Sequence, residues 1–304
     1  MITKFGKRFL TTYLAGNVSF ATKDIAVGIG STTPNSKGND TRLEFEFYRL
    51  PATLGSIDIS QTGTDGDGDP IFSYTAIYKA TLPQDISGII SEVGLYPGER
   101  KSVNSFDSKF ITSFENNLTW FNGIENPALK SNNTTEPFIS KIGDAMVQVD
   151  VGPSSTKEYT NSLVVLDISG YSVNDSISIA YKKVDNNLSK IRVKLYSSAN
   201  AYYYVDFTPA SGTGDRIQSI PVGTLLGNIS SGYTPDPTSI TKIGIEVTAG
   251  SGGATKVYFD GIRINDEDTF DPQYGLISRS VLSTPLQKPS GRPVDIEYKL
   301  LLEF

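Results

Sequence analysis

The chain of 304 residues contains no cysteine and no histidine, and each absence excludes a class of chemistry. Without cysteine there is no disulfide framework, so packing and hydrogen bonds have to hold the fold. Zinc sites built from Cys and His ligands are excluded as well. Ser-His-Asp and Cys-His catalysis both lack the imidazole that serves as their general base. Carboxylate or lysine chemistry remains, and we expect a protein that is neither an enzyme nor dependent on a cofactor.

The chain also lacks a basic stripe and a long apolar run. Its 27 Lys and Arg residues stand against 33 Asp and Glu residues, a net charge of −6, which argues against a nucleic-acid partner. No segment approaches the roughly 20 apolar residues of a membrane span. The partly apolar N-terminus is interrupted at Thr11 and Thr12, and its large apolar residues repeat at helical spacing. We therefore expect a short amphipathic helix there rather than a signal peptide.

Short alternating segments dominate the remainder and predict an all-β fold. In residues 42–50, Leu43, Phe45 and Phe47 alternate with polar or aromatic neighbours, as on a half-buried strand. Between residues 145 and 264, about eight short strands recur with turn signals between them. Eight strands at this spacing suit a jelly-roll β-sandwich.

Two changes in composition suggest how the domains are arranged. Residues 122–137 are rich in Asn, Ser, Thr and Pro, residues 265–275 are acidic, and both resemble linkers. The closing segment, residues 294–304, alternates cleanly and needs sheet partners, which we expect in the N-terminal region. The prediction is a discontinuous β-rich outer domain with a short N-terminal helix, residues 1–135 plus 266–304. A jelly-roll sandwich of residues 136–265 interrupts it.

The inserted sandwich carries tyrosines and cations at strand spacing. Tyr202 and Tyr204 share one strand face, and Arg192 and Lys194 share another. Aromatic rings stack on the C–H faces of sugars, and a row of cations suits an anionic glycan. Ordinary packing and a solvated sheet face remain the alternatives. The candidate glycan-binding residues are Tyr181, Tyr196, Tyr202, Tyr204, Arg192 and Lys194.

Several motifs of the outer domain resemble those of tailed-bacteriophage virion proteins. Ile25–Thr32 resembles a strand of the form IA-GxG-T, and Asp40–Arg49 follows it as a DTxLxxExxR-like stretch. An EVGLY strand lies at Ile90–Tyr96. The opening Ile2–Leu10 and the closing Val294–Leu301 fit the same pattern.

This resemblance implies a structural component of a virion: a tail, baseplate, neck or tail-fibre-associated protein. It implies a location in the virion, other virion proteins as partners, and a homo-oligomer of threefold or sixfold symmetry. The alternative functions are a lectin-like adhesion or receptor-binding module for a host-surface glycan and a capsid decoration protein. A carboxylate-dependent glycan depolymerase is the alternative from the enzyme class.

A second resemblance concerns the end of the inserted sandwich. Val257–Ile264 resembles the last strand of carbohydrate-binding jelly rolls. In those modules a similar aspartate helps to hold a structural calcium against the first strand. The resemblance therefore implies Asp260 as a calcium ligand, with Asp144 or Asp150 as its partner.

Overall fold

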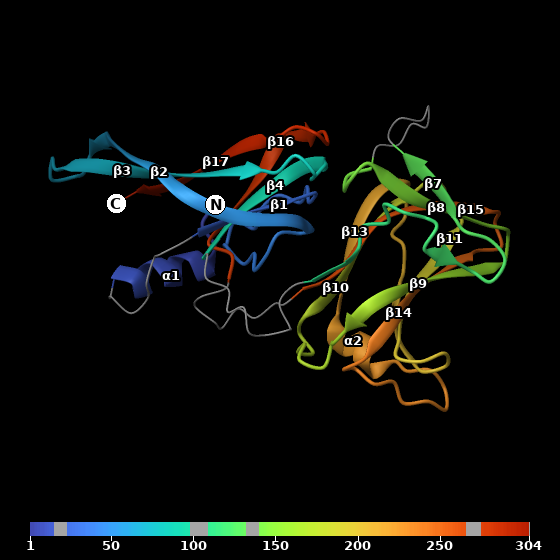
Figure 1. Ribbon diagram of the computed structural model, residues 1–304. Coiled ribbons are helices and arrows are strands. Elements are labelled where there is room, and N and C mark those ends of the chain that lie inside the picture. Colours follow the sequence, from blue (N-terminus) through green and yellow to red (C-terminus); the bar gives the residue numbers. More distant parts are fainter. Residues whose placement is uncertain (15–22, 98–108, 132–139, 266–274, 304) are drawn as a thin grey trace. The chain divides into compact units, whose positions relative to one another are not determined.

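The computed structural model describes residues 1–14, 23–97, 109–131, 140–265 and 275–303. Within these ranges the fold is all-β, with two short helices and three antiparallel sheets (Figure 1). The chain forms two compact units: residues 1–102 with 268–304, and residues 103–267. Neither helix in the described ranges has the length and apolar character needed to cross a bilayer.

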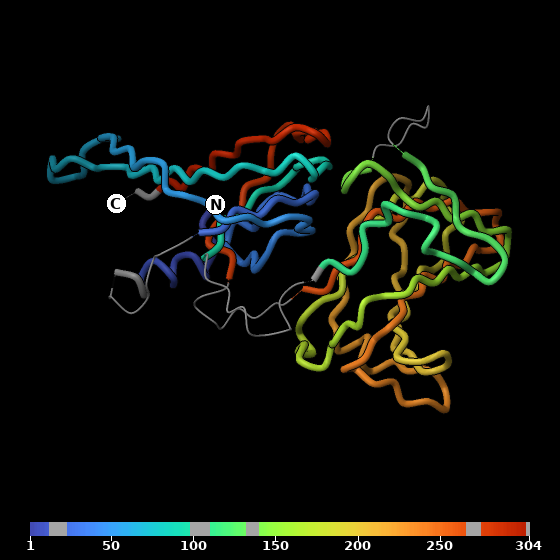
Figure 2. The backbone as a smooth tube through the Cα atoms, viewed as in Figure 1, coloured from blue at the N-terminus to red at the C-terminus, as the bar shows by residue number. Residues whose placement is uncertain are grey.

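The first unit contains one helix and one six-stranded antiparallel sheet in the order β16-β4-β1-β2-β3-β17. Both described chain ends belong to it (Figure 2). Its elements are α1 (Lys4–Leu14), β1 (Lys23–Gly28), β2 (Glu46–Thr64), β3 (Pro70–Leu82), β4 (Gly88–Pro97), β16 (Ser278–Lys288) and β17 (Val294–Glu303). β17 pairs with β3 along its whole length, so the closing strand joins the sheet begun by the N-terminal region.

The predicted N-terminal helix is confirmed as α1, and its apolar side faces the core. Phe5 and Phe9 are buried and their rings stack with centroids 6.0 Å apart. They pack in one cluster with buried residues of β1, β3, β4 and β17. The helical spacing of these two residues thus reflects burial on one side of the helix.

The second strand is longer than the sequence pattern suggested. The strand expected at residues 42–50 begins later, at Glu46, and continues to Thr64 as β2, which leaves the core after Ala52. From Thr53 to Thr64 every residue of β2 is exposed. With the first half of β3 these residues form a projecting hairpin, which we call the arm (Figure 1).

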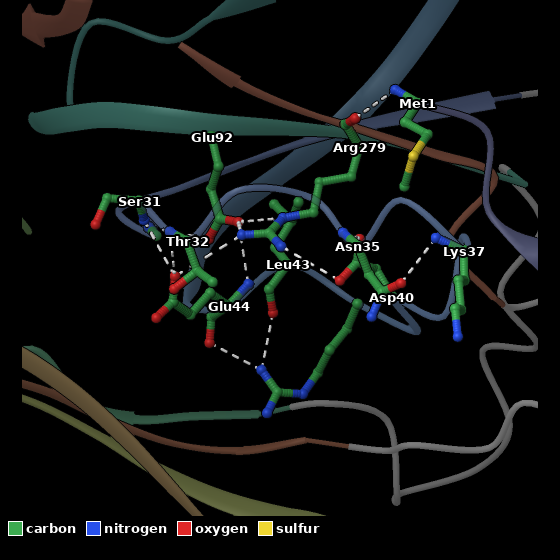
Figure 3. A network of polar contacts seen from close by, with 12 residues as sticks. Met1, Ser31, Thr32, Asn35, Lys37, Asp40, Leu43, Glu44, Glu92 and Arg279 are labelled. Carbon is green, nitrogen blue, oxygen red and sulfur yellow. Dashed lines mark hydrogen bonds and ion pairs between the residues drawn. The ribbon is translucent and has the colours of Figure 1, made fainter. Parts of the chain in front are cut away.

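A buried carboxylate joins the parts of this unit. Glu92 of β4 is fully buried and accepts hydrogen bonds from the backbone N–H groups of Gly30 (3.0 Å), Glu44 (3.0 Å) and Phe45 (2.9 Å). Figure 3 shows Glu92 beside Glu44 and Arg279. Nε and Nη2 of Arg279 lie 2.9 and 2.8 Å from Glu92 Oε2. Arg279 follows the insertion in sequence, so this ion pair connects the two halves of the divided unit.

The motif residues lie around this ion pair. Arg279 Nη1 lies 3.5 Å from Asp40 Oδ1, and its Nη2 lies 3.8 Å from Glu44 Oε2. Glu44 in turn accepts the N–H groups of Ser31 and Thr32. The stretches of residues 25–32, 40–49 and 90–96 therefore share one polar cluster. The order of these three stretches in the sequence is explained by the need to bring them together around the Glu92–Arg279 ion pair.

Two glycines make this cluster possible. A Cβ atom on Gly28 would lie 2.5 Å from Glu92 Oε1, and one on Gly30 would lie equally close. Side-chain atoms do not tolerate such approaches, so only glycine lets the strand lie against the carboxylate. The buried carboxylate of Glu92 therefore explains why residues 28 and 30 are glycines.

The second unit is a two-sheet β-sandwich. One sheet has the order β13-β10-β15-β8-β7, with β5 also paired to β15, and the other has the order β12-β11-β14-β9-β6. Large apolar residues of both sheets fill the space between them. Its elements are β5 (Lys109–Thr112), β6 (Trp120–Phe121), β7 (Ala128–Ser131), β8 (Ala145–Val151), β9 (Thr156–Leu166), β10 (Ser176–Lys183), β11 (Leu188–Tyr196), β12 (Tyr202–Phe207), β13 (Gly214–Pro221), α2 (Val222–Gly227), β14 (Ile240–Ala249) and β15 (Thr255–Asn265).

The boundary between the units differs from residues 135/136 suggested by the sequence. β5, β6 and β7 pair with β15, β9 and β8, all strands of the sandwich. The polar composition before β7 comes from turns: Asn122 accepts two backbone N–H groups, and Asn117 donates to Pro127 O at 2.7 Å. Asparagine stabilises such turns through hydrogen bonds of its own side chain. A segment with several Asn-stabilised turns therefore has the same polar composition as a linker. Residues 132–139 and 266–274 of the expected linkers lie outside the described residues.

The buried ion pair makes the first unit sensitive to a single substitution. We expect Glu92→Gln to destabilise it by about 3 kcal/mol, because Arg279 stays buried beside an uncharged partner. The single tryptophan, Trp120, lies buried in the second unit, so its fluorescence reports that unit alone. Far-UV circular dichroism reports both units, so in urea titrations the part of its transition that comes from the first unit should shift to lower urea, while the fluorescence transition stays in place.

The matched control is Asp58→Asn, which neutralises a solvent-exposed carboxylate in the same unit. This variant should leave both transitions unchanged. A Glu92→Gln protein with an unshifted circular dichroism transition would contradict the role given to Glu92.

Candidate functional site

The outer face of the five-stranded sheet collects the tyrosines and cations selected from the sequence. Along β11 the residues Ile191, Val193 and Leu195 point into the core and are fully buried. Their neighbours alternate to the other face of the sheet. On that face Arg192, Lys194 and Tyr196 of β11 lie opposite Asp206, Tyr204 and Tyr202 of β12.

Three tyrosine rings form a cluster on this face. The rings of Tyr196 and Tyr202 are 4.9 Å apart, and those of Tyr202 and Tyr204 are 6.2 Å apart. The guanidinium of Arg192 lies 4.2 Å from the centre of the Tyr204 ring, and Lys194 Nζ lies 5.1 Å from that of Tyr202. These contacts fix the orientations of Tyr202 and Tyr204, which remain only partly buried.

Carboxylates hold the cations of the same face. Lys194 Nζ lies 2.6 Å from Glu158 Oε2 on β9 and 2.7 Å from Glu246 Oε2 on β14. Arg192 donates two hydrogen bonds to Asp206, at 2.6 and 2.8 Å. The sheet therefore presents aromatic rings within a network of paired charges.

The network also sets the protonation of its members. Burial alone would lower the pKa of Lys194, but the hydrogen bonds that it donates to Glu158 and Glu246 raise the pKa above its ordinary value. Burial, together with a 2.5 Å hydrogen bond to Glu158, raises the pKa of Tyr196 far above that of a free tyrosine. Lys194 is therefore an ammonium and Tyr196 a neutral donor at physiological pH.

The carboxylates of this face and two further features of it were not selected from the sequence. A Cβ atom on Gly244 would lie 2.6 Å from Glu158 Oε1 and 3.1 Å from Tyr196 Cε2, so this glycine lets the two side chains meet across β14. Phe121 pairs with Thr160 and is 46% exposed on the same face, at the opposite edge from Tyr204. The positions of Gly244 and Phe121 on this face depend on which residues of neighbouring strands are paired. The sequence of a single strand does not show this pairing.

Tyr181 does not belong to the cluster. It lies on β10 in the other sheet, is buried in the sandwich core, and donates its hydroxyl to Gln218 Oε1 at 2.8 Å. Burial raises the pKa of Tyr181 to about 12. Alternation along a strand does not show which of the two sheets the strand belongs to. Tyr181 packs in the core of the sandwich.

The calcium site implied by resemblance does not fit the residues present. Asp260 is buried, but its oxygens accept hydrogen bonds from Ser140 Oγ (2.9 Å), Lys141 N (2.8 Å) and Ile142 N (3.3 Å). Asp144 and Asp150 are exposed. Within the described ranges no three acidic side chains come together as a metal site would require. Asp260 instead fixes the chain at residues 140–142 against β15.

No protein-family model matches the chain, and no curated protein matches it. Among solved structures, the family 11 carbohydrate-binding module of Clostridium thermocellum, in complex with a β-1,3-1,4-mixed-linked tetrasaccharide, is 19% identical. That match covers 53% of this chain and 97% of the module, with a TM-score of 0.37. A family 30 carbohydrate-binding module of a cellulosomal cellulase from the same organism is 17% identical, with coverages of 55% and 98% and a TM-score of 0.34.

A third match is the enzymatically active domain of tailspike protein 4 of bacteriophage CBA120. It is 9% identical, covers 53% of this chain and 21% of that chain, and has a TM-score of 0.31. The first two matches show a likeness to carbohydrate-binding jelly rolls over about half of the chain. At these scores none of the matches supports a functional argument.

The Asp260 carboxyl should make the second unit less stable as the pH rises from about 4 to about 7. Burial raises the pKa of Asp260 from 3.8 to about 7 and that of nearby Glu115 from 4.5 to about 7. Between these values the folded unit retains protons that the unfolded chain has released, so stability falls with pH and levels off above 7. Urea titrations followed by Trp120 fluorescence at pH 5, 6, 7 and 8 measure the slope.

Asp260→Asn cannot titrate and should reduce this slope between pH 5 and 7. The matched control, Asp150→Asn, changes an exposed aspartate of the same unit and should keep the wild-type slope. A wild-type stability that rises between pH 5 and 7 would contradict the environment assigned to Asp260.

Proposed function

We propose that this chain is a non-enzymatic glycan-binding protein that holds a carbohydrate on the outer face of β12-β11-β14-β9-β6. The observation that carries the proposal is the tyrosine cluster of residues 196, 202 and 204, fixed by neighbouring cations. Tyr196 is buried, whereas the rings of Tyr202 and Tyr204 are partly exposed and in fixed orientations, so these two offer stacking surfaces at little cost in side-chain entropy. The surrounding carboxylates and ammonium groups supply hydrogen bonds for hydroxyl groups.

The size of the face suits an oligosaccharide. One row of paired residues crosses all five strands from Phe121 through Thr160, Gly244 and Lys194 to Tyr204. Four strand spacings of about 4.8 Å give a row about 19 Å long, with an aromatic ring at each end. A single sugar would leave most of it uncovered.

The charges of the face favour a neutral carbohydrate. Four cations, Lys190, Arg192, Lys194 and Lys242, stand beside three carboxylates, Glu158, Asp206 and Glu246. Arg192 and Lys194 are already held at hydrogen-bonding distance by carboxylates. An anionic glycan would have to displace these partners, whereas hydroxyl groups can share them. The cation row of β11 is therefore a scaffold for the tyrosines.

The same ion pairs support binding without catalysis. Glu158 and Glu246 are close enough for a paired-carboxylate mechanism, since both contact Lys194 Nζ. Such a mechanism needs one protonated carboxyl as general acid. Both carboxylates are instead engaged by the Lys194 ammonium, Glu158 Oε2 at 2.6 Å and Glu246 Oε2 at 2.7 Å, which opposes that role.

The stacking tyrosines provide the direct test. We expect Tyr202→Ala and Tyr204→Ala in the full chain to weaken binding to neutral glycans at least about tenfold, because each removes a stacking surface. Binding is measured on an array with neutral, sulfated and uronic-acid glycans, and then by calorimetry on the best ligand.

The matched control is Tyr233→Ala, which removes an aromatic side chain that is 49% exposed outside the sheet. It should bind as the wild type does, and unchanged urea transitions confirm that all variants fold. Binding that survives both Tyr202→Ala and Tyr204→Ala, or no binding to any glycan, contradicts the proposal.

We propose further that the first unit attaches the protein to a tailed-phage virion, as its motifs suggest. What supports this is the arm, on which Ile57 and Ile59 are 57% and 61% exposed, a surface suited to a protein partner.

We expect the chain to co-purify with phage particles through a density gradient, and we expect the double substitution Ile57→Asp with Ile59→Asp to abolish this co-purification. Thr62→Asp, on the same arm, is the control. A wild-type chain absent from particles contradicts the proposal.

A further inference from the structure

Among the residues that the structure describes, the last strand of the first unit has one edge that pairs with no other strand. β17 pairs with β3 at every position from Val294 to Glu303, with no shift of register. It ends the sheet order, and within the described ranges no strand pairs with its other side. In an antiparallel ladder alternate residues point their N–H and C=O groups toward such an edge, which makes it a template for another strand.

The opposite end of the same sheet is protected. Met1 and Ile2 cover part of β16: the terminal amine of Met1 donates to Arg279 O at 2.8 Å, and Ile2 forms a bridge to Ser278. The register of β16 with β4 also breaks between Val281 and Leu286, where Pro285 lacks an N–H donor. Such breaks prevent edge pairing, and β17 has none.

The two faces of β17 differ sharply. Tyr298 and Leu300 point into the core and are 4% exposed. Asp295, Glu297 and Lys299, which occupy the alternate positions along the strand, are exposed on the outer face. An additional strand would therefore have to offer apolar residues on one face and complementary charges on the other.

We propose that β17 pairs edge to edge with β17 of a second copy of this chain, antiparallel and with Tyr298 opposite Tyr298. In this register Glu297 of each copy lies opposite Lys299 of the other, so the two-fold axis creates two attractive pairs. Ile296, which is half-buried, lies opposite Leu300 and extends the apolar face across the interface.

Neighbouring registers are worse. Centring the axis on Glu297 gives two attractive pairs of Asp295 with Lys299 but places two glutamates opposite each other. Centring it on Lys299 places two lysines opposite each other, whereas the proposed register has no like-charge pair. Like charges directly opposite each other destabilise a strand pair. Lys79 already lies 2.7 Å from Glu297 and fixes its position within the sheet. The charge pattern therefore selects one register for a second copy.

Sedimentation equilibrium of the full chain tests the pairing. We expect a monomer–dimer equilibrium in the wild type, at least about tenfold weaker in Lys299→Glu and restored in Glu297→Lys with Lys299→Glu. The control Lys37→Glu makes the same change of charge on an exposed loop and should behave as the wild type does. A wild type that is monomeric at about 100 μM, a wild-type trimer or hexamer, or a dimer insensitive to Lys299→Glu would overturn the proposal.

A cross-link tests the register, because the chain has no cysteine of its own. In the proposed register residue 295 lies opposite residue 301 of the other copy. These two positions of one chain are six residues apart on the same strand, too far for an internal disulfide. Asp295→Cys with Leu301→Cys should give a covalent dimer under mild oxidation, and Asp295→Cys alone should not. Failure of the double variant to cross-link, or equal cross-linking by the single variant, would contradict this register.

Discussion

The buried ion pair between Glu92 and Arg279 is the interaction on which the first unit depends. Glu92 accepts three backbone N–H groups from the segment of residues 30–45, and its charge is balanced by an arginine that comes 187 residues later in the chain. A carboxylate without solvent is costly unless it is fully paired. The first unit therefore needs residues from before and after the insertion. This ion pair explains how the unit forms one fold although the second unit interrupts its sequence.

In the second unit, strand alternation separates the residues of the core from those of the outer sheet face. The inward residues of β11 and β12 fill the sandwich core, and the outward residues form the tyrosine cluster and its ion pairs. Because the two sets point in opposite directions, the outer face can change without disturbing the core. Gly244 adds a local requirement, since only its missing side chain lets Glu158 reach Tyr196.

Much of the fold could be predicted from local patterns. Alternation revealed most strands, helical spacing revealed α1, and Tyr202 and Tyr204 were rightly placed on one face, because each pattern depends on neighbours along one element. Assignments that depend on pairing between elements were not accessible. Tyr181 lies in the other sheet, Asp260 binds backbone N–H groups, and the Asn-rich stretch before β7 belongs to the sandwich. Arg279 gave no local signal, although its partners lie within motifs visible in the sequence.

The claim that the outer sheet face binds a carbohydrate is tested most directly by tyrosine-selective NMR. The full chain, labelled at its tyrosine rings, is titrated with the neutral oligosaccharide that binds best. We expect saturable shifts for Tyr202 and Tyr204 at the same ligand concentration, with Tyr181 and Tyr233 unmoved. Saturable binding that shifts Tyr233 or leaves Tyr202 and Tyr204 unmoved would contradict it.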